Sequence, residues 1–124
     1  MAASFPATTR AAILTFHFAD RIKAQIMLAS RLLVTVTHLK EPDREGGRRL
    51  FLEFLKGLEQ EINLGQTLID DPEMIRVRTV MTGLIGMADA GVFQDFQSHL
   101  TWMISMMATY AQRGMEYLVR EKLL

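Results

Sequence analysis

Hydrophobic residues recur at three- and four-residue intervals in four stretches of the chain, and polar residues occupy the positions between them. This spacing follows the turn of an α-helix and places the hydrophobic residues on one face. No stretch shows the strict two-residue alternation that is typical of a half-buried β-strand. The pattern therefore predicts an all-α protein that contains four amphipathic helices.

The first predicted helix begins at Thr8 or Thr9, where a hydroxyl group can cap the first turn, and ends at about His38. Pro42 prevents its continuation. Its hydrophobic face contains Phe18, Ile22, Ile26, Ala29, Leu33 and Val36, and its polar face contains Arg10, His17, Arg21, Arg31, Thr35 and His38. Because the polar face is narrow, we expect most of this helix to be buried. Residues 1–7 are expected to form a loosely ordered leader.

The second predicted helix follows a turn at residues 41–47, which is rich in proline and glycine, and ends at about Ile69. Asp43 is the candidate cap. The hydrophobic face contains Phe51, Leu55, Leu58, Ile62 and Ile69, and the polar face contains Arg49, Glu53, Lys56, Gln60, Asn63 and Thr67. This is the most clearly amphipathic of the four helices.

The third predicted helix begins at Asp71-Pro72-Glu73, because Asp can cap the helix and Pro is compatible with the first helical position. Its buried face contains Met74, Val77, Met81, Leu84 and Ala88. A strip of small residues lies beside that face: Thr79, Gly83, Gly86 and Ala90. The favoured interpretation is close helix packing inside the protein, and the alternative is contact with a partner.

The fourth predicted helix extends from about Val92 or Phe93 to Glu121, and Gly91 separates it from the third. Its core face contains Phe93, Phe96, Leu100, Met103, Met107, Ala111 and Leu118. In an alternative arrangement, the third and fourth helices form one long rod that a partner must cover. Short connections favour antiparallel neighbours, so we expect a single domain, residues 1–124, folded as an up-down-up-down four-helix bundle with long first and last helices.

Composition supports one hydrophobic core and excludes several classes of function. Hydrophobic residues make up 49% and charged residues 23% of the 124 residues, which is a globular balance. Fourteen basic and fourteen acidic residues give no net charge that would attract nucleic acid or an anionic membrane. The chain has no cysteine, no predicted leader for export and no run of about 20 apolar residues that could span a bilayer. We therefore expect a cytoplasmic protein with no role at a membrane.

The residues of common active sites do not occur in recognisable patterns. The three histidines, His17, His38 and His99, lie in no nucleophile motif, and the chain lacks the Glu-x-x-His pairs of di-iron bundles. The nearest metal-ligand spacings are His17 with Asp20 and Asp95 with His99, both of which we interpret as surface pairs. The sequence therefore predicts no enzymatic activity, no metal and no cofactor.

A basic cluster near the start of the second helix is the candidate anion contact, and it consists of Lys40, Arg44, Arg48 and Arg49. Helix N-termini also favour anions. However, Glu41, Asp43 and Glu45 alternate with these cations, and the competing interpretation is a solvated helix end with mixed salt links. The cluster supports an alternative function, a helical subunit of a nucleoprotein complex that contacts phosphates.

The fourth helix carries a second set of large side chains away from its core face, namely His99, Trp102, Met106, Tyr110 and Tyr117. Trp, Tyr and Met are enriched in protein interfaces. We therefore predict that these residues contact a second copy of the chain or a helix of another protein. The competing interpretation is that Trp102 packs across the edge of its own bundle.

The leading functional prediction is a non-enzymatic protein-interaction module that forms a homo-oligomer or binds a partner helix through its fourth helix. The nucleoprotein subunit is the main alternative. A third alternative is a carrier of apolar ligands, whose cavity would lie among the methionines at positions 27, 81, 87, 103 and 107.

Overall fold

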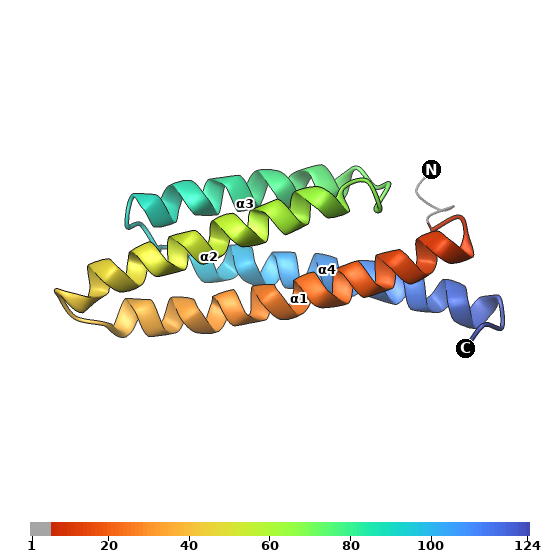
Figure 1. Ribbon diagram of the computed structural model, residues 1–124, viewed down its shortest axis with the longest axis horizontal. Coiled ribbons are helices and arrows are strands. Elements are labelled where there is room, and N and C mark those ends of the chain that lie inside the picture. The colour runs from red at the N-terminus through yellow and green to blue at the C-terminus, as the bar shows by residue number, and fades with distance from the viewer. Residues whose placement is uncertain (1–5) are drawn as a thin grey trace.

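The computed structural model describes residues 6–124, which form four α-helices joined by short loops (Figure 1). The helices are α1 (Thr9–His38), α2 (Asp43–Gly65), α3 (Glu73–Asp89) and α4 (Phe96–Arg120). Successive helices run in opposite directions (Figure 1), and the described residues contain no β-strand. The predicted all-α, up-down-up-down four-helix fold is confirmed.

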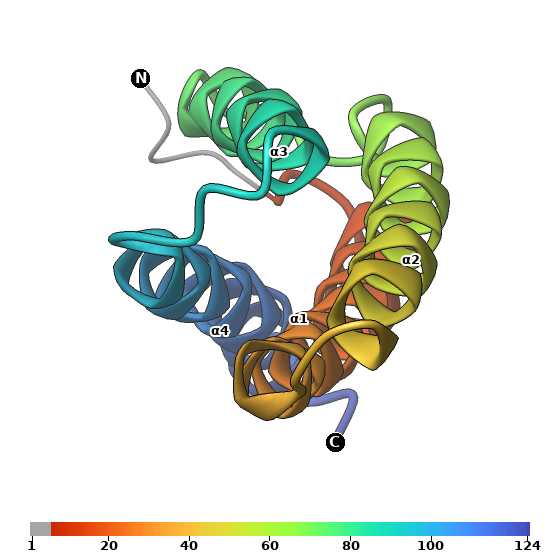
Figure 2. The same cartoon turned by 90° about the vertical axis from the view of Figure 1, so that its left-hand side faces the viewer.

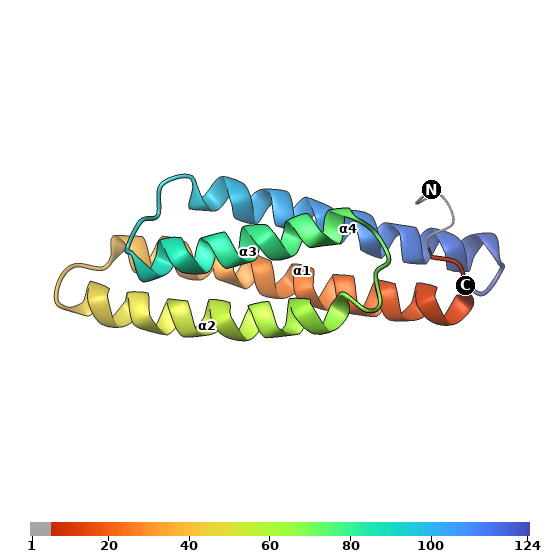
Figure 3. The ribbon, with the colours of Figure 1, turned by 90° about the horizontal axis from the view of Figure 1, so that it is seen from above.

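The four helices are arranged in a ring when the bundle is viewed from one end (Figure 2). α1 contacts α2 and α4, and α3 contacts the same two helices from the other side. The contact between α1 and α4 is the most extensive in the fold, and the contact between α3 and α4 is the smallest. The long helices α1 and α4 extend beyond the loop that joins α2 to α3, at the end where the described chain begins and ends (Figure 3).

The core is formed by the hydrophobic faces that the sequence predicts. Every residue predicted for the hydrophobic faces of α2 and α3 is buried, and so are most of those predicted for α1 and α4. Phe18 and Phe93 are the partly buried exceptions. Ile69 is buried although it lies beyond the end of α2, because the chain turns after Gly65 and directs this side chain inward. About 25 cal/mol are gained for each Å² of apolar surface removed from water, so this shared core is the main source of stability.

Two helix ends have the cap structures that the sequence indicates. The Thr8 hydroxyl accepts a hydrogen bond from the backbone N–H of Ala11 at 3.1 Å, and this caps α1. α3 ends where Gly91 adopts a φ of 74°, and the N–H of Val92 donates to the carbonyl of Met87 at 2.9 Å. This hydrogen-bond pattern is a Schellman motif, in which glycine takes the left-handed position. α3 and α4 are therefore two separate helices, and the single-rod alternative is wrong.

Two predicted helix boundaries are wrong by a few residues, and one predicted cap is wrong. α2 ends at Gly65, because the N–H groups of Leu68 and Ile69 both donate to the Gly65 carbonyl and start a turn there. α4 begins at Phe96 rather than near Val92, since Asp95 has a φ of 61° and interrupts the helix. Asp43 is the first residue of α2 and its side chain does not cap that helix.

The predicted leader is only partly described. Residues 1–5 lie outside the described residues, and so does the prediction that they are loosely ordered. Pro6 is buried and is followed by Ala7, which is exposed.

Candidate interaction site

Tyr110 is fully buried in the core, so its prediction as a surface interface residue is wrong. It lies three residues after Met107 and one before Ala111, both of which are buried on the same side of α4. Gly114 is also buried on this side of the helix. The buried face of α4 is therefore wider than the sequence pattern indicates. A large side chain at position 110 fills the space between α4 and the loop that precedes α3.

The hydroxyl group of Tyr110 belongs to a small polar cluster at that loop. The Asp71 side chain is only 8% exposed, and its carboxylate lies 3.4 Å from Nη1 of Arg113 on α4. Asp71 also accepts a hydrogen bond from the backbone N–H of Glu73 at 3.2 Å, in agreement with its predicted role at the start of α3. Burial, together with the neighbouring Asp71 carboxylate, raises the pKa of Tyr110. The cluster connects the α2/α3 loop to α4.

Trp102 is partly buried and packs towards α3 of its own chain. The guanidinium carbon of Arg76 lies 5.1 Å from the centre of the Trp102 ring, which is cation–π geometry. This contact supports the interpretation that Trp102 covers an edge of its own bundle. Met106 and Tyr117 are also partly buried, and His99 is exposed. For His99, Trp102, Met106 and Tyr117, contact with a partner stays a prediction.

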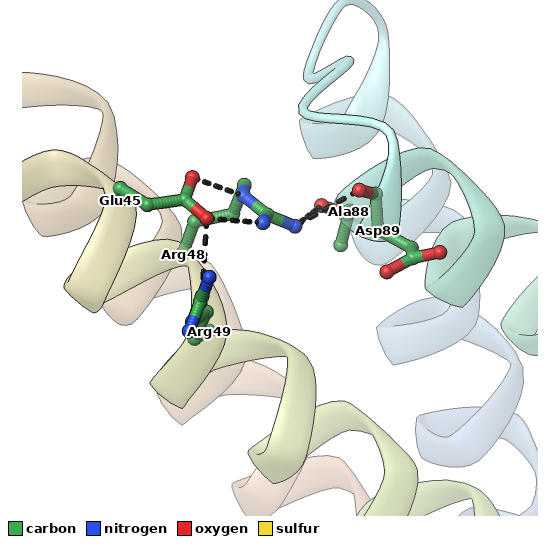
Figure 4. Close-up of polar contacts among 5 residues, drawn as sticks. All are labelled: Glu45, Arg48, Arg49, Ala88 and Asp89. Atoms are coloured by element: carbon green, nitrogen blue, oxygen red, sulfur yellow. Dashed lines mark hydrogen bonds and ion pairs between the residues drawn. The ribbon is translucent and has the colours of Figure 1, made fainter.

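Arg48 joins the start of α2 to the end of α3 (Figure 4). Its Nε and Nη2 donate to the Glu45 carboxylate at 2.9 and 2.6 Å. Its Nη1 donates to the backbone carbonyls of Ala88 and Asp89 at 3.1 and 2.9 Å. The last carbonyls of a helix have no partner within the helix and carry partial negative charge, so a guanidinium group stabilises this end of α3.

Arg49 is also engaged by Glu45, because its Nε donates to the same carboxylate at 3.1 Å (Figure 4). Hydrogen bonds from the two arginines lower the pKa of Glu45 to about 2. A surface hollow beside this cluster is lined by three acidic and two basic side chains, namely Glu41, Glu45 and Asp89 with Arg44 and Arg48. This arrangement supports the interpretation as mixed salt links. Anion contact at the exposed Lys40 and Arg44 stays a prediction.

The small-residue strip of α3 does not pack inside the protein, contrary to the favoured expectation. A Cβ atom added at Gly83 or Gly86 would meet no atom within 4 Å. Close packing occurs instead at Gly114 on α4, where an added Cβ would lie 2.7 Å from the carbonyl oxygen of Ala12 and 3.1 Å from Cβ of Phe16. The strip lies on the outer side of α3, and the close approach is made by α1 and α4.

The outer side of α1 exposes hydrophobic residues that the sequence analysis assigned to a mostly buried helix. Ile13, Met27 and Val34 are 51%, 50% and 53% exposed. They belong to a set of positions spaced alternately by three and four residues, which places them along one side of the helix. We call this set the α1 stripe, and its members are Ile13, Phe16, Asp20, Lys23, Met27, Ser30 and Val34. The spacing was visible in the sequence, but the more regular core pattern of the same helix obscured it.

A groove between α1 and α4 borders the α1 stripe. Three members of the stripe line it, namely Phe16, Asp20 and Lys23. Its other side consists of α4 residues Ala111, Gln112, Met115, Glu116, Val119 and Arg120. Hydrophobic side chains therefore line the groove together with two acidic and two basic ones. We call the α1 stripe and this groove together the outer face.

Two features are absent from the described residues, namely a metal-binding cluster and a helix able to cross a membrane. Residues 6–124 contain no group of three or more His, Cys, Asp or Glu side chains that could hold a metal ion. No helix within this part of the chain is long and apolar enough to cross a bilayer. Comparison of the chain with models of protein families, with curated proteins and with solved structures finds no match. The fold and surface define an antiparallel four-helix protein with exposed apolar side chains beside a groove on its outer face.

Proposed function

We propose that this protein is a non-enzymatic interaction module that binds another protein chain through its outer face. The observation that carries the proposal is the exposure of Met27 and Val34 on the α1 stripe, of which other members line the groove. Contiguous exposed apolar surface with polar groups at its rim is typical of sites where proteins bind each other. Methionine suits such a site because its flexible side chain adapts to the shape of a partner.

The proposed contact surface lies on the side of α4 that faces α1, whereas the sequence analysis predicted a contact surface around Trp102, which packs towards α3. The predicted set around Trp102 has partners within the chain, since Arg76 covers the Trp102 ring and Tyr110 lies in the core. The outer face, in contrast, leaves Met27, Val34 and Val119 about half exposed. Burial of these side chains against a partner would remove apolar surface from water, which favours association.

Photo-crosslinking tests the proposal in cells that make the protein. A photoreactive amino acid at Met27 should form covalent adducts with a bound chain, whereas the same group at Lys56 should not. Lys56 is the matched control because it is exposed on α2, and its contact with Glu53 is a local ion pair of 3.4 Å. A second variant, Val34→Glu, should abolish the adducts formed from position 27. Equal yields from positions 27 and 56 would contradict the proposal.

A further inference from the structure

We propose that the outer face binds a second copy of the same chain, with the two α1 helices antiparallel about a two-fold axis between Asp20 and Lys23. This inference rests on the proposed function and adds the identity and orientation of the partner. It is carried by the order of side chains in the α1 stripe, by the charges at its centre and by the shape of the groove beside it.

Four consecutive members of the stripe form a symmetric segment, in which an apolar residue stands at each end and opposite charges stand in the middle. Asp20 and Lys23 lie at the centre of this segment, and the apolar residues Phe16 and Met27 flank them at equal distances. A two-fold axis between Asp20 and Lys23 places each residue opposite the one that is equally far from the axis in the other copy. Asp20 then faces Lys23 of the second copy, and Phe16 faces Met27 of the second copy.

The central charges are available for this pairing. Within one chain, Nζ of Lys23 lies 4.0 Å from the Asp20 carboxylate, at the outer limit of an ion pair, and the two side chains are 34% and 59% exposed. Exposed pairs of this kind contribute little to stability, so little is lost when they exchange partners. In the antiparallel dimer both cross-pairs join opposite charges.

The same charges exclude the parallel arrangement. If the two α1 helices ran in the same direction in register, Asp20 would face Asp20 and Lys23 would face Lys23. Juxtaposed like charges oppose association, so they select against that orientation. Charge complementarity therefore favours a second copy of the chain in the antiparallel orientation.

The shape of the outer face matches the charge pattern. Phe16 lines the groove and is partly buried, whereas Met27 is half exposed. In the antiparallel dimer, Met27 of the second copy lies opposite Phe16, where Ala111 and Met115 of α4 provide apolar surface. The two-fold axis repeats this contact at the other end of the interface. Each chain then contributes one projecting methionine and one groove.

Light scattering coupled to gel filtration across a concentration series tests the dimer. The wild-type chain should have twice its monomer mass of 14.1 kDa. Lys23→Asp brings four carboxylates together in the homodimer, and Asp20→Lys brings four ammonium groups together. Each variant alone should raise the dimer dissociation constant at least tenfold. Because the substituted positions are exposed, circular dichroism should show unchanged helix content.

The decisive measurement is made on a mixture of the two variants. An equimolar mixture of Asp20→Lys and Lys23→Asp should form a heterodimer, since every cross-pair again joins opposite charges. The doubly substituted chain, Asp20→Lys with Lys23→Asp, should recover the wild-type dissociation constant. The same reversals at Glu53 and Lys56, a similar local pair on α2, should leave the dimer unchanged.

Spin labels at Thr35 report the direction of packing. The antiparallel dimer separates the two labels by about 40 Å along the helix axis at ~1.5 Å per residue, whereas a parallel dimer brings them close together. A wild-type monomer at millimolar concentration, a short label distance or a variant mixture that stays monomeric would overturn the inference. If the chain is a monomer and the photoreactive group at position 27 crosslinks to a different protein, the dimer is wrong but the proposed function stands. If that group forms no adduct at all, the proposed function is wrong as well.

Discussion

Helix α4 packs against two neighbours in different ways. Towards α1 the contact includes Gly114, where an added Cβ would lie 2.7 Å from the backbone of Ala12. Towards α3 its residues are large, with Trp102 partly buried and Tyr110 fully buried. The first contact is the most extensive in the fold and the second is the smallest. The most extensive helix contact is therefore the one in which a glycine lies against the backbone of the neighbouring helix.

The two contacts also leave different surfaces behind. On the outer side of α1, Met27 and Val34 are about half exposed. Towards α3, Trp102 and Met106 are partly buried and pack against the core. The apolar residues that the proposed interface uses are therefore more exposed than Trp102 and Met106.

The largest expected effect comes from Gly114→Val at the close contact. The added carbon atoms overlap the α1 backbone, so the free energy of unfolding should fall by about 3 kcal/mol in urea denaturation. Gly83→Ala on α3 is the matched control, because its new Cβ meets no atom within 4 Å. That variant should gain about 1 kcal/mol from helix propensity. A destabilised Gly83→Ala together with a neutral Gly114→Val would contradict the comparison.

Removal of the Arg48 side chain tests whether contacts with α2, rather than contacts with α4, stabilise the end of α3. Arg48→Ala removes the donors to the Ala88 and Asp89 carbonyls and should reduce the free energy of unfolding clearly more than Arg49→Ala does. Hydrogen exchange should increase in the last turn of α3. Arg49→Ala is the control, and because its side chain is 74% exposed, its effect should stay within about 0.5 kcal/mol. Equal losses in both variants would contradict a specific role for Arg48.

Tyr110→Phe tests how much the Tyr110 hydroxyl group contributes to the polar cluster between α4 and the α2/α3 loop. Loss of the buried hydroxyl should cost about 1 kcal/mol at neutral pH. In the wild type, stability should also fall as pH rises above about 10, because the unfolded tyrosine ionises there while the raised pKa of Tyr110 keeps the folded form protonated. Urea denaturation at neutral and alkaline pH measures both effects. If the variant loses stability above about pH 10 as steeply as the wild type, Tyr110 is not the cause.

The smallest expected effect is that of Arg76→Gln, which removes the cation above Trp102. The free energy of unfolding should fall by about 0.5 kcal/mol, and the tryptophan fluorescence should change as the ring becomes more accessible to water. Lys56→Gln is the control. Lys56 pairs with Glu53, three residues away, just as Arg76 pairs with Glu73. Unlike Arg76, Lys56 lies above no aromatic ring of the described residues. A fluorescence change of the same size in the control would show that the Arg76 contact is not specific.

The sequence supports accurate prediction of those features that depend on neighbouring residues along the chain. The cap at Thr8 and the glycine at position 91 act within one or two helical turns, and both have the predicted role. Every residue predicted for the hydrophobic faces of α2 and α3 is buried for the same reason, although the prediction for α2 lacked Leu52. The boundary errors at Gly65 and Asp95 arose because no side chain there marks the end of the hydrophobic period.

The candidate site could be predicted only in part. His99, Trp102, Met106 and Tyr117 do lie outside the fully buried core, but Tyr110 lies within it. A helical pattern leaves the rotation of a helix uncertain by about one residue, and that uncertainty is enough to move a side chain from surface to core. The Arg48 contact with α3 joins residues 40 and 41 positions apart, so no local pattern could reveal it.

The sequence by itself determined the four helices, their order, their antiparallel connections and the faces that form the core, because all of these follow from local spacing and short loops. Only the tertiary structure decided which glycine lies at a close helix contact, which arginines are engaged and which hydrophobic residues remain exposed. Gly83, Gly86 and Gly114 are all glycines within helices, yet only Gly114 meets the backbone of another helix. The physical reason is that a side chain's free energy depends on the atoms around it, and the fold places atoms there from distant parts of the chain.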